Sequence, residues 1–166
     1  MTKLVAKELS REAFAPYGEV VAVTNENEIL DINYGRTQRH HRLASVQLGG
    51  DDAIAIASIF RSQAVELPFR VEVMERHPLG SQMFMPLSGH PYLVAVAPAG
   101  EFDWTAVELF LAQADQGVNY HAGTWHHYCL ALEGVSDFLV VDRDGAGDNC
   151  DEVHLSDSQQ LILGEL

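Results

Sequence analysis

The segment from Phe69 to His77 combines an apolar strand pattern with two groups that can carry acid–base or metal chemistry. In an extended chain alternate side chains point to the same side, so Glu75 and His77 are expected to share a face with the apolar residues at 69, 71 and 73. Because such neighbours lie about 6.6 Å apart along a strand, a carboxylate and an imidazole can converge on one small ion or substrate. The alternative is that the strand ends at Met74 and both groups are solvated in the following turn.

Three further histidines lie within seven residues, at the end of the segment from Gly117 to His127. His126 opens an apolar run, so its side chain is expected to point the same way as Leu130, with His127 pointing the opposite way. His121 precedes a flexible Ala-Gly step, where an imidazole can act as a base or simply hydrogen-bond the turn. A structural or surface role is the alternative for each of these histidines.

A cationic segment, from Arg36 to Arg42, stands out in an otherwise acidic chain. It holds three of the ten Lys and Arg residues and two histidines, whereas the whole chain carries a formal charge of −14. The forked guanidinium groups of Arg36 and Arg39, with His40 beside them, suit a small carboxylate, and the surrounding negative charge would repel larger polyanions. The alternative is a solvated loop whose arginines pair with acidic residues of the same subunit or of a partner.

The composition places these groups in one domain, residues 1–166. A chain of 166 residues with 47% hydrophobic and 20% charged side chains can enclose one core and is not expected to be disordered. Its 24 acidic against 10 basic residues exclude nucleic acid as a partner. The sequence shows neither a secretion signal nor an apolar run of about 18 residues, so we expect no membrane attachment and a cytoplasmic location. Cys129 and Cys150 are then expected to be reduced thiols.

Short β-like runs separated by turn residues recur along the chain, and they must position the groups above. We predict nine strands, over residues 19–24, 43–48, 53–61, 69–76, 82–87, 92–97, 107–113, 126–132 and 138–142. Helical signals are limited to a turn that Ser10 caps and Phe14 ends, a turn over 104–106, and a last helix over 157–163 capped by Ser156. This pattern predicts an all-β fold, a β-sandwich or small barrel with a few short peripheral helices.

The spacing of these residues resembles the two metal-binding motifs of cupins, which are small β-barrels of the jelly-roll type. The first motif, with Glu in place of its first His and Gln in place of its Glu, is matched by Glu75-x-His77-x4-Gln82-x6-Gly89. The second, with His in place of its Pro, is matched by His121-x-Gly123-x2-His126. The resemblance implies a cupin-like barrel that holds a metal through Glu75, His77, Gln82 and His126.

Longer phrases, in the same order along the chain, resemble the ureidoglycolate lyase family, which acts in allantoin (purine) catabolism. They are DINYG from residue 31, RHH from 39, ERHPLGSQMFMP from 75, GVNYH from 117, WHH from 125, DFLVVDR from 137 and DNC from 148. The resemblance implies a homodimeric cupin-like enzyme that splits the small molecule (S)-ureidoglycolate into glyoxylate and urea.

The implied reaction needs a clamp for the carboxylate, a base near the hydroxyl group and an acid near the leaving nitrogen. Candidates for the clamp are Arg36, Arg39, His40 and Arg143. Candidates for the base and the acid are His121, His126 and Tyr120.

A divalent ion at the four cupin positions would bind the α-hydroxy carboxylate and lower the pKa of its hydroxyl group. Nitrogen and oxygen ligands without a thiolate suit Mn, Fe, Co, Ni or Zn, and the family resemblance favours Ni. No organic cofactor is expected. In the metal-free alternative, Glu75 and His77 transfer protons directly.

Two other functions fit the same residues. Glu75, His77 and His126 form the two-histidine, one-carboxylate set of non-haem iron dioxygenases, which would consume oxygen. The other alternative is a non-catalytic cupin that binds small anions through the cationic segment. An inward Glu75 argues against it, because a carboxylate repels an anion unless it is protonated or metal-bound.

Overall fold

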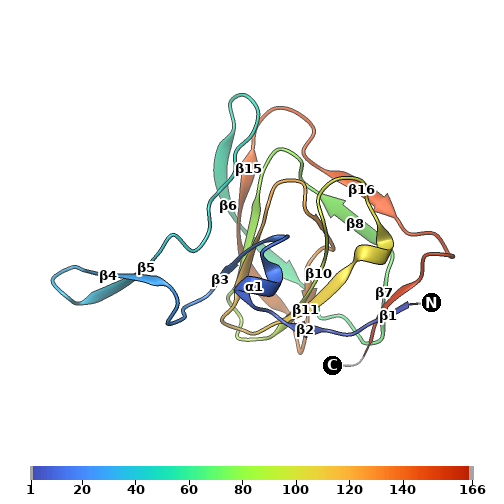
Figure 1. Cartoon of the computed structure of the whole chain (residues 1–166), viewed down its shortest axis with the longest axis horizontal. Coiled ribbons are helices and arrows are strands. Elements are labelled where there is room, and N and C mark those ends of the chain that lie inside the picture. The colour runs from blue at the N-terminus through green and yellow to red at the C-terminus, as the bar shows by residue number, and fades with distance from the viewer. Residues whose placement is uncertain (1, 165–166) are drawn as a thin grey trace.

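The computed structural model describes residues 2–164, which form two large β-sheets packed around a common core (Figure 1). The seven-stranded sheet contains, in order, β16 (Asp151–His154), β8 (Val73–Arg76), β13 (Trp125–His126), β10 (Tyr92–Ala97), β11 (Glu108–Ala112) and β2 (Lys7–Glu8), with β14 (Leu130–Ala131) also paired to β10. The five-stranded sheet contains, in order, β3 (Gly18–Val21), β12 (Gly117–Tyr120), β9 (Gln82–Pro86), β15 (Ser136–Asp144) and β6 (Ile54–Ser62). A three-stranded sheet contains β1 (Thr2–Leu4), β17 (Leu161–Leu163) and β7 (Phe69–Val71).

Two hydrophobic cores lie on opposite faces of the seven-stranded sheet. The first core, toward the five-stranded sheet, includes the rings of Phe14, Phe84 and Phe138. The second core, toward the three-stranded sheet, includes Met74 and Leu161. Every residue of β10 is buried because the strand has a core on each side, which explains why its sequence is an unbroken apolar run.

The predicted all-β class is confirmed, and the architecture is a sandwich in which both large sheets stay open over residues 2–164. The first two predicted helical segments are also present. The hydroxyl group of Ser10 caps α1 (Arg11–Phe14) by accepting from the Ala13 N–H at 3.2 Å, and η1 (Trp104–Ala106) is a single 3₁₀ turn. No helix in the described part of the chain is long and apolar enough to cross a bilayer.

The predicted helix over 157–163 is wrong. Ser156 closes only a turn, in which its carbonyl oxygen accepts from the Gln159 N–H at 2.9 Å, and the chain then enters β17 between β1 and β7. Leu161 and Leu163 are buried two positions apart, which is the period of a strand rather than of a helix. The predicted strand over 43–48 is also wrong, because this segment is irregular and is bridged to Gly80 at Leu48.

The predicted strand over 69–76 is in fact two strands. The chain leaves the three-stranded sheet after Val71 and joins the seven-stranded sheet at Val73, so the alternation of side chains is broken at Glu72. Val71 and Met74 both lie in the second core. Residues 69, 71, 73, 75 and 77 were expected to share one face. This expectation is wrong for residues 69 and 71, which precede the break.

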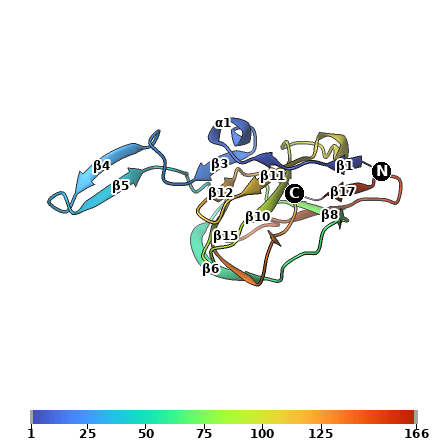
Figure 2. The same cartoon turned by 90° about the horizontal axis from the view of Figure 1, so that it is seen from below.

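A β-hairpin, β4 (Glu28–Ile32) and β5 (Thr37–His41), projects from the sandwich and forms a two-stranded sheet of its own (Figures 1 and 2). We call residues 28–41 the arm. All five positions of β4 are exposed, so no buried face marks this strand in the sequence. The arm contains most of the cationic segment.

Candidate metal and acid–base site

The structure brings Glu75, His77 and His126 together, with one ligand atom from each within 4.8 Å of the others. β8 and β13 pair so that Glu75 lies opposite His126, and His126 in turn lies opposite Val96, which belongs to the first core. Directly opposed residues of neighbouring strands point to the same face. These three side chains, here called the Glu75 cluster, therefore face the interior of the sandwich.

Hydrogen bonds to main-chain carbonyls fix which ring nitrogen of each histidine is free. His77 Nδ1 lies 2.7 Å from the carbonyl oxygen of Asn149, and His126 Nδ1 lies 3.2 Å from that of His127. A carbonyl oxygen can only accept, so each Nδ1 donates a proton, and in the neutral ring Nε2 is the nitrogen with the lone pair. Both Nε2 atoms are buried and have no hydrogen-bond partner among residues 2–164, so they are available to a metal or to a substrate proton.

Gln82 and Asp142 form a polar pair on the five-stranded sheet. Gln82 Nε2 donates to Asp142 Oδ2 at 3.1 Å, which orients the amide so that Oε1 points away from the carboxylate. Gln82 Oε1 and Asp142 Oδ1 are buried with no partner in the described structure. Asp142 is not among the residues predicted for the site, although its place in β15 is a signal for it: Asp142 has the same parity as Phe138 and Val140, which lie in the first core.

Tyr120 connects this pair to the Glu75 cluster. It lies opposite Gln82 in the register of β12 with β9. Its ring stacks on that of His126, with centroids 4.2 Å apart and planes 3° apart. The His77 ring lies on the same histidine, at a centroid distance of 5.2 Å. The two sheets therefore contribute to one polar region at the same end of the interior.

Burial sets the protonation states in this region. It lowers the pKa of His126 to about 3, with a further contribution from His77, because the charged ring would lose its hydration. His126 is therefore neutral at pH 7. Burial raises the pKa of Glu75, an effect that His77 opposes and the negative charge of Glu152 reinforces. Burial also raises the pKa of Tyr120 well above its ordinary value of 10, so its hydroxyl group stays protonated.

Both histidines of the 126–127 pair are buried, and each faces a different core. His127 meets the ring of Phe69 edge-on at 5.5 Å, on the side of the second core. The expectation that His126 points the same way as Leu130 is wrong, because Leu130 belongs to the second core. The chain leaves the strand between β13 and β14, and this interruption shifts the alternation.

Several of the sequence-predicted residues lie away from the Glu75 cluster. His121 Nε2 lies 3.0 Å from Glu19 Oε2, and both residues line a surface cavity of about 590 Å³ together with Arg42. Arg36, Arg39 and His40 are on the arm, which extends away from the sandwich that encloses the cluster (Figure 2).

Arg143 is buried and binds main-chain oxygens. Its Nε donates to the Gly49 carbonyl at 2.6 Å, and its two terminal nitrogens donate to the carbonyls of Gly145 and Ala146 at 3.4 and 2.6 Å. These bonds hold two loops against the end of β15. In the isolated chain Arg143 therefore has a structural role.

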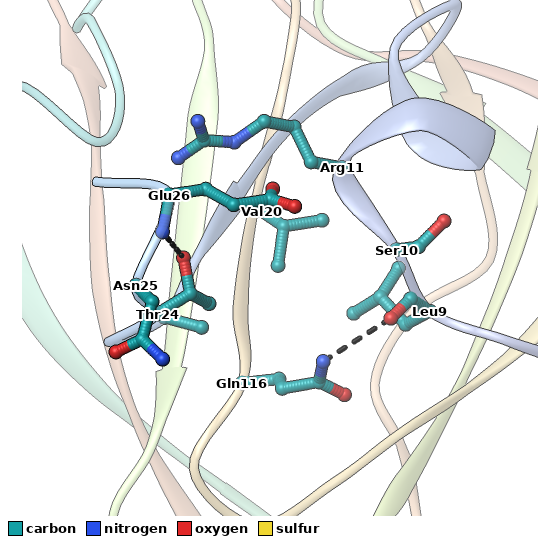
Figure 3. A pocket seen from close by; sticks show the side chains of 9 residues that line it. Leu9, Ser10, Arg11, Val20, Thr24, Asn25, Glu26 and Gln116 are labelled. Carbon is teal, nitrogen blue, oxygen red and sulfur yellow. Dashed lines mark hydrogen bonds between the residues drawn. The ribbon is translucent and has the colours of Figure 1, made fainter.

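A separate cavity of about 360 Å³ lies beside α1 and β3 (Figure 3). Two hydrogen bonds join residues of its lining. Gln116 Nε2 donates to the Leu9 carbonyl at 3.1 Å, and the Glu26 N–H donates to Thr24 Oγ1 at 3.3 Å. Because none of its lining residues belongs to the Glu75 cluster, we place the candidate chemistry in the cluster rather than in this cavity.

Comparison with known proteins adds the family. A family model described as ureidoglycolate lyase matches residues 1–162. The chain belongs to the ureidoglycolate lyase family. Proteins named ureidoglycolate lyase from Pseudomonas syringae pv. syringae and Stutzerimonas stutzeri are each 48% identical to it over 164 residues, which is 98% of this chain and 96% of each relative. The ureidoglycolate lyase of Pseudomonas entomophila is also 48% identical, over 98% of both chains.

The donor atoms in this ureidoglycolate lyase family member fit a divalent transition metal. Imidazole nitrogens from His77 and His126 and a carboxylate from Glu75 form a mixed nitrogen and oxygen set. A buried polar atom without a partner is costly, and the Nε2 atoms of the two histidines are two such atoms. A bound ion would satisfy them, so these three predicted ligands are compatible with a metal.

Proposed function

We propose that this chain cleaves (S)-ureidoglycolate into glyoxylate and urea, as one lyase domain over residues 1–166. The observation that carries the proposal is the 48% identity, over 98% of the chain, to proteins named ureidoglycolate lyase. The Glu75 cluster supports it because the cluster supplies buried proton-transfer and binding groups that the reaction requires.

The reaction moves one proton. In ureidoglycolate a single carbon bears the hydroxyl group, the carboxylate and the ureido nitrogen. Cleavage breaks the bond from this carbon to nitrogen, converts the hydroxyl into the carbonyl of glyoxylate, and transfers the hydroxyl proton to the departing nitrogen. Atoms and charge then balance without a co-reactant.

We assign this transfer to Glu75. The hydroxyl oxygen and the leaving nitrogen share one carbon, so one carboxylate can accept the proton from the first and return it to the second. Burial raises the pKa of Glu75, which makes it a stronger base than an exposed carboxylate. His77 and His126 offer buried, unpartnered Nε2 atoms for binding, and the protonated hydroxyl of Tyr120 donates a hydrogen bond that orients the substrate.

A divalent ion would be held by Glu75, His77, Gln82 and His126. When bound, it would lower the pKa of the substrate hydroxyl group, so that a weak base suffices. Nickel is our first candidate, ahead of Mn, Fe, Co and Zn. Because Glu75 has two carboxylate oxygens, binding through one leaves the other free for the proton.

We propose that Arg36 or Arg39 clamps the substrate carboxylate, with His40 beside them. The arm carries these residues away from the Glu75 cluster of their own chain (Figure 2). They can therefore act as a clamp only in the site of a second copy, which supports a homodimer as the working form. The two free cysteines are typical of a reducing compartment and support a cytoplasmic location.

The decisive experiment is to supply purified protein with racemic ureidoglycolate under strict anaerobiosis. We expect release of glyoxylate and urea and consumption of one enantiomer. Absence of glyoxylate above the spontaneous background, with and without added Ni(II) or Mn(II), would refute the proposal. Ammonia in place of urea would identify a hydrolase, and a requirement for oxygen would identify a dioxygenase, an alternative that the family membership does not favour.

A further inference from the structure

A second group of metal-ligating side chains lies on the solvent side of Glu75. One ligand atom each from Glu75, Cys150 and Glu152 lies within 4.8 Å of the other two. We call these three residues the Cys150 group. Cys150 and Glu152 are exposed, whereas the side chain of Glu75 is 25% exposed. The Cys150 group therefore lies where the Glu75 cluster meets the solvent.

Strand register places the two carboxylates of the group face to face. β16 runs beside β8 and pairs Glu152 directly with Glu75 (Figure 1). On the other side of β8, the same register pairs Glu75 with His126 of β13. Directly opposed residues point to the same face, so Glu152, Glu75 and His126 form one row across three strands. Cys150 immediately precedes β16 and brings its thiol to the end of this row.

The two opposed carboxylates have no lysine or arginine between them. Like charges directly opposite each other destabilise a pair of strands. Over residues 2–164 the ion pairs of these carboxylates involve only histidines: Glu75 with His126 at 3.7 Å and Glu152 with His154 at 3.8 Å. His126 is neutral at pH 7, because burial lowers its pKa to about 3. A divalent cation between the carboxylates would remove their repulsion.

The buried histidine in the same row is a second indication of a ligand. His126 is 1% exposed, and its Nε2 is buried without a hydrogen-bond partner in the described part of the chain. The Cys150 group and the Glu75 cluster share Glu75, so ligand atoms of both groups surround one carboxylate. A carboxylate has two oxygens, and the ions of two-metal sites lie about 3.5–4 Å apart. Glu75 is therefore placed to bridge two ions.

We propose that Glu75, Cys150 and Glu152 hold a second divalent cation, a thiophilic ion such as Zn(II), at the solvent side of the Glu75 cluster. A thiolate with carboxylates suits zinc, and three protein ligands leave its fourth position open. Zinc–ligand bonds of about 2.0–2.3 Å require Cys150 and Glu152 to close on the ion, which their exposure allows. Binding forms the sulfur–zinc bond and releases the thiol proton to solvent, and no electron is transferred.

The second ion would inhibit the lyase. In the proposed function one oxygen of Glu75 binds the first ion and the other moves the substrate proton. An ion in the Cys150 group occupies this other oxygen and removes the base. The inhibition rests on the proposed function, whereas the binding of the ion does not.

The test of binding is a titration of the chelator-treated full chain with Cd(II), a thiophilic probe, without substrate. A thiolate bound to cadmium gives an ultraviolet charge-transfer band, which reports the cysteine ligand alone. We expect a saturable band that Zn(II) displaces. Cys150→Ser should abolish the band, and Cys129→Ala, the control, should retain it. Absence of the band in the wild type, or its persistence in Cys150→Ser, would overturn the proposal.

A second variant shows whether the thiol acts with the carboxylates. Glu152→Gln should weaken cadmium binding by about tenfold or more, since even the outer partners of metal ligands contribute 10- to 100-fold to affinity. Asp148→Asn is the matched control, because Asp148 is exposed just before Cys150 and outside the group. Equal affinities of these two variants would show that the thiol binds cadmium alone, and the site would be rejected. Circular dichroism of each variant verifies that the fold is retained.

Inhibition is measured by glyoxylate release with increasing Zn(II), each protein being compared with its own rate without zinc. Cys150→Ser should require about tenfold more zinc than the wild type for the same fractional inhibition. Equal sensitivity would mean that zinc acts elsewhere, and the inhibitory role would be wrong. A chain without lyase activity would refute the proposed function, and the cadmium titration would still decide the site.

Discussion

At the scale of single residues, the chemistry depends on which atom of each polar side chain is left free. The main-chain carbonyls of Asn149 and His127 occupy Nδ1 of His77 and His126, so that in the neutral rings Nε2 carries the lone pair. Outer partners of this kind fix the tautomer and orientation of a ligand and commonly change metal affinity or activity by 10- to 100-fold. The Glu75 cluster is thus oriented in the absence of substrate.

His126→Ala should lower turnover of ureidoglycolate by about 10² or more, the usual loss when a buried acid–base or ligand group is removed. Steady-state glyoxylate release measures the effect. His154→Ala provides the control, because the side chain of His154 is 76% exposed. A change of less than about threefold in the His126 variant would remove this residue from the site.

Asp142→Asn should lower turnover by about 10- to 100-fold without unfolding the protein, because the carboxylate that fixes the Gln82 amide is replaced by a group that can also donate. The affinity of the chain for Ni(II), measured by titration calorimetry, should fall in parallel. Asp51→Asn, at an exposed position, is the control. Wild-type turnover together with wild-type nickel affinity would show that Asp142 does not position Gln82.

The two cysteines should differ in reactivity. Burial raises the pKa of the Cys129 thiol to about 12, so roughly one part in 10⁴ is thiolate at pH 8. Cys150 is exposed. Alkylation at pH 8 followed by peptide mass spectrometry should modify Cys150 first and the partly buried Cys129 far more slowly. Equal rates in the native protein would contradict the raised pKa of the Cys129 thiol.

At the scale of elements, the seven-stranded sheet has a hydrophobic core on each face, and this double coverage determines which strands can be predicted from the sequence. Apolar runs such as β10 are easily recognised as strands, and Glu75 and His77 do converge as their spacing predicts. The alternation of side chains predicts the wrong face wherever a strand is interrupted, at Glu72 and between β13 and β14. Such an interruption depends on how the chain packs in the folded protein, and the local sequence pattern does not encode it. β12 is absent from the predicted strands for a related reason. All four of its residues are buried, so its sequence shows no alternation between buried and exposed positions.

This double coverage buries His127 as well as His126, which makes the fold sensitive to acid. Burial lowers the pKa of His127 to about 4, below the value of about 6.5 expected in the unfolded chain. Between these values the unfolded state binds more protons, so the stability present above pH 6.5 is lost as the pH falls toward 4. The midpoint of urea unfolding should be lower at pH 5 than at pH 7. In His127→Gln this difference should shrink, whereas in His154→Gln it should not.

At the scale of the whole molecule, the arm holds the cationic residues away from the Glu75 cluster, although they were predicted to bind the substrate carboxylate there. The sequence shows the cationic cluster but not its distance from Glu75, because that distance depends on a projection that leaves the sandwich altogether (Figure 2). Family resemblance implies a homodimer, and the projection of the arm is the reason why we propose that its arginines act in a second copy.

Arg39→Gln should raise the Michaelis constant for ureidoglycolate, since the amide cannot pair with the substrate carboxylate. If the clamp acts in the second copy, Arg39→Gln and His126→Ala should complement each other. Random pairing yields a mixed dimer in half of the population with one complete site of two, so activity should recover to about a quarter of the wild-type value. No recovery in a verified mixed dimer would place the clamp in the same chain as the Glu75 cluster.

The position of the arm in the chain also bears on how the proposed homodimer would form. Residues 28–41 leave the ribosome before β6, β9, β12 and β15, which build most of the five-stranded sheet. In the proposed homodimer, assembly is then a second-order step that follows folding of the sandwich, and refolding from denaturant should end in a slow phase whose rate rises with protein concentration.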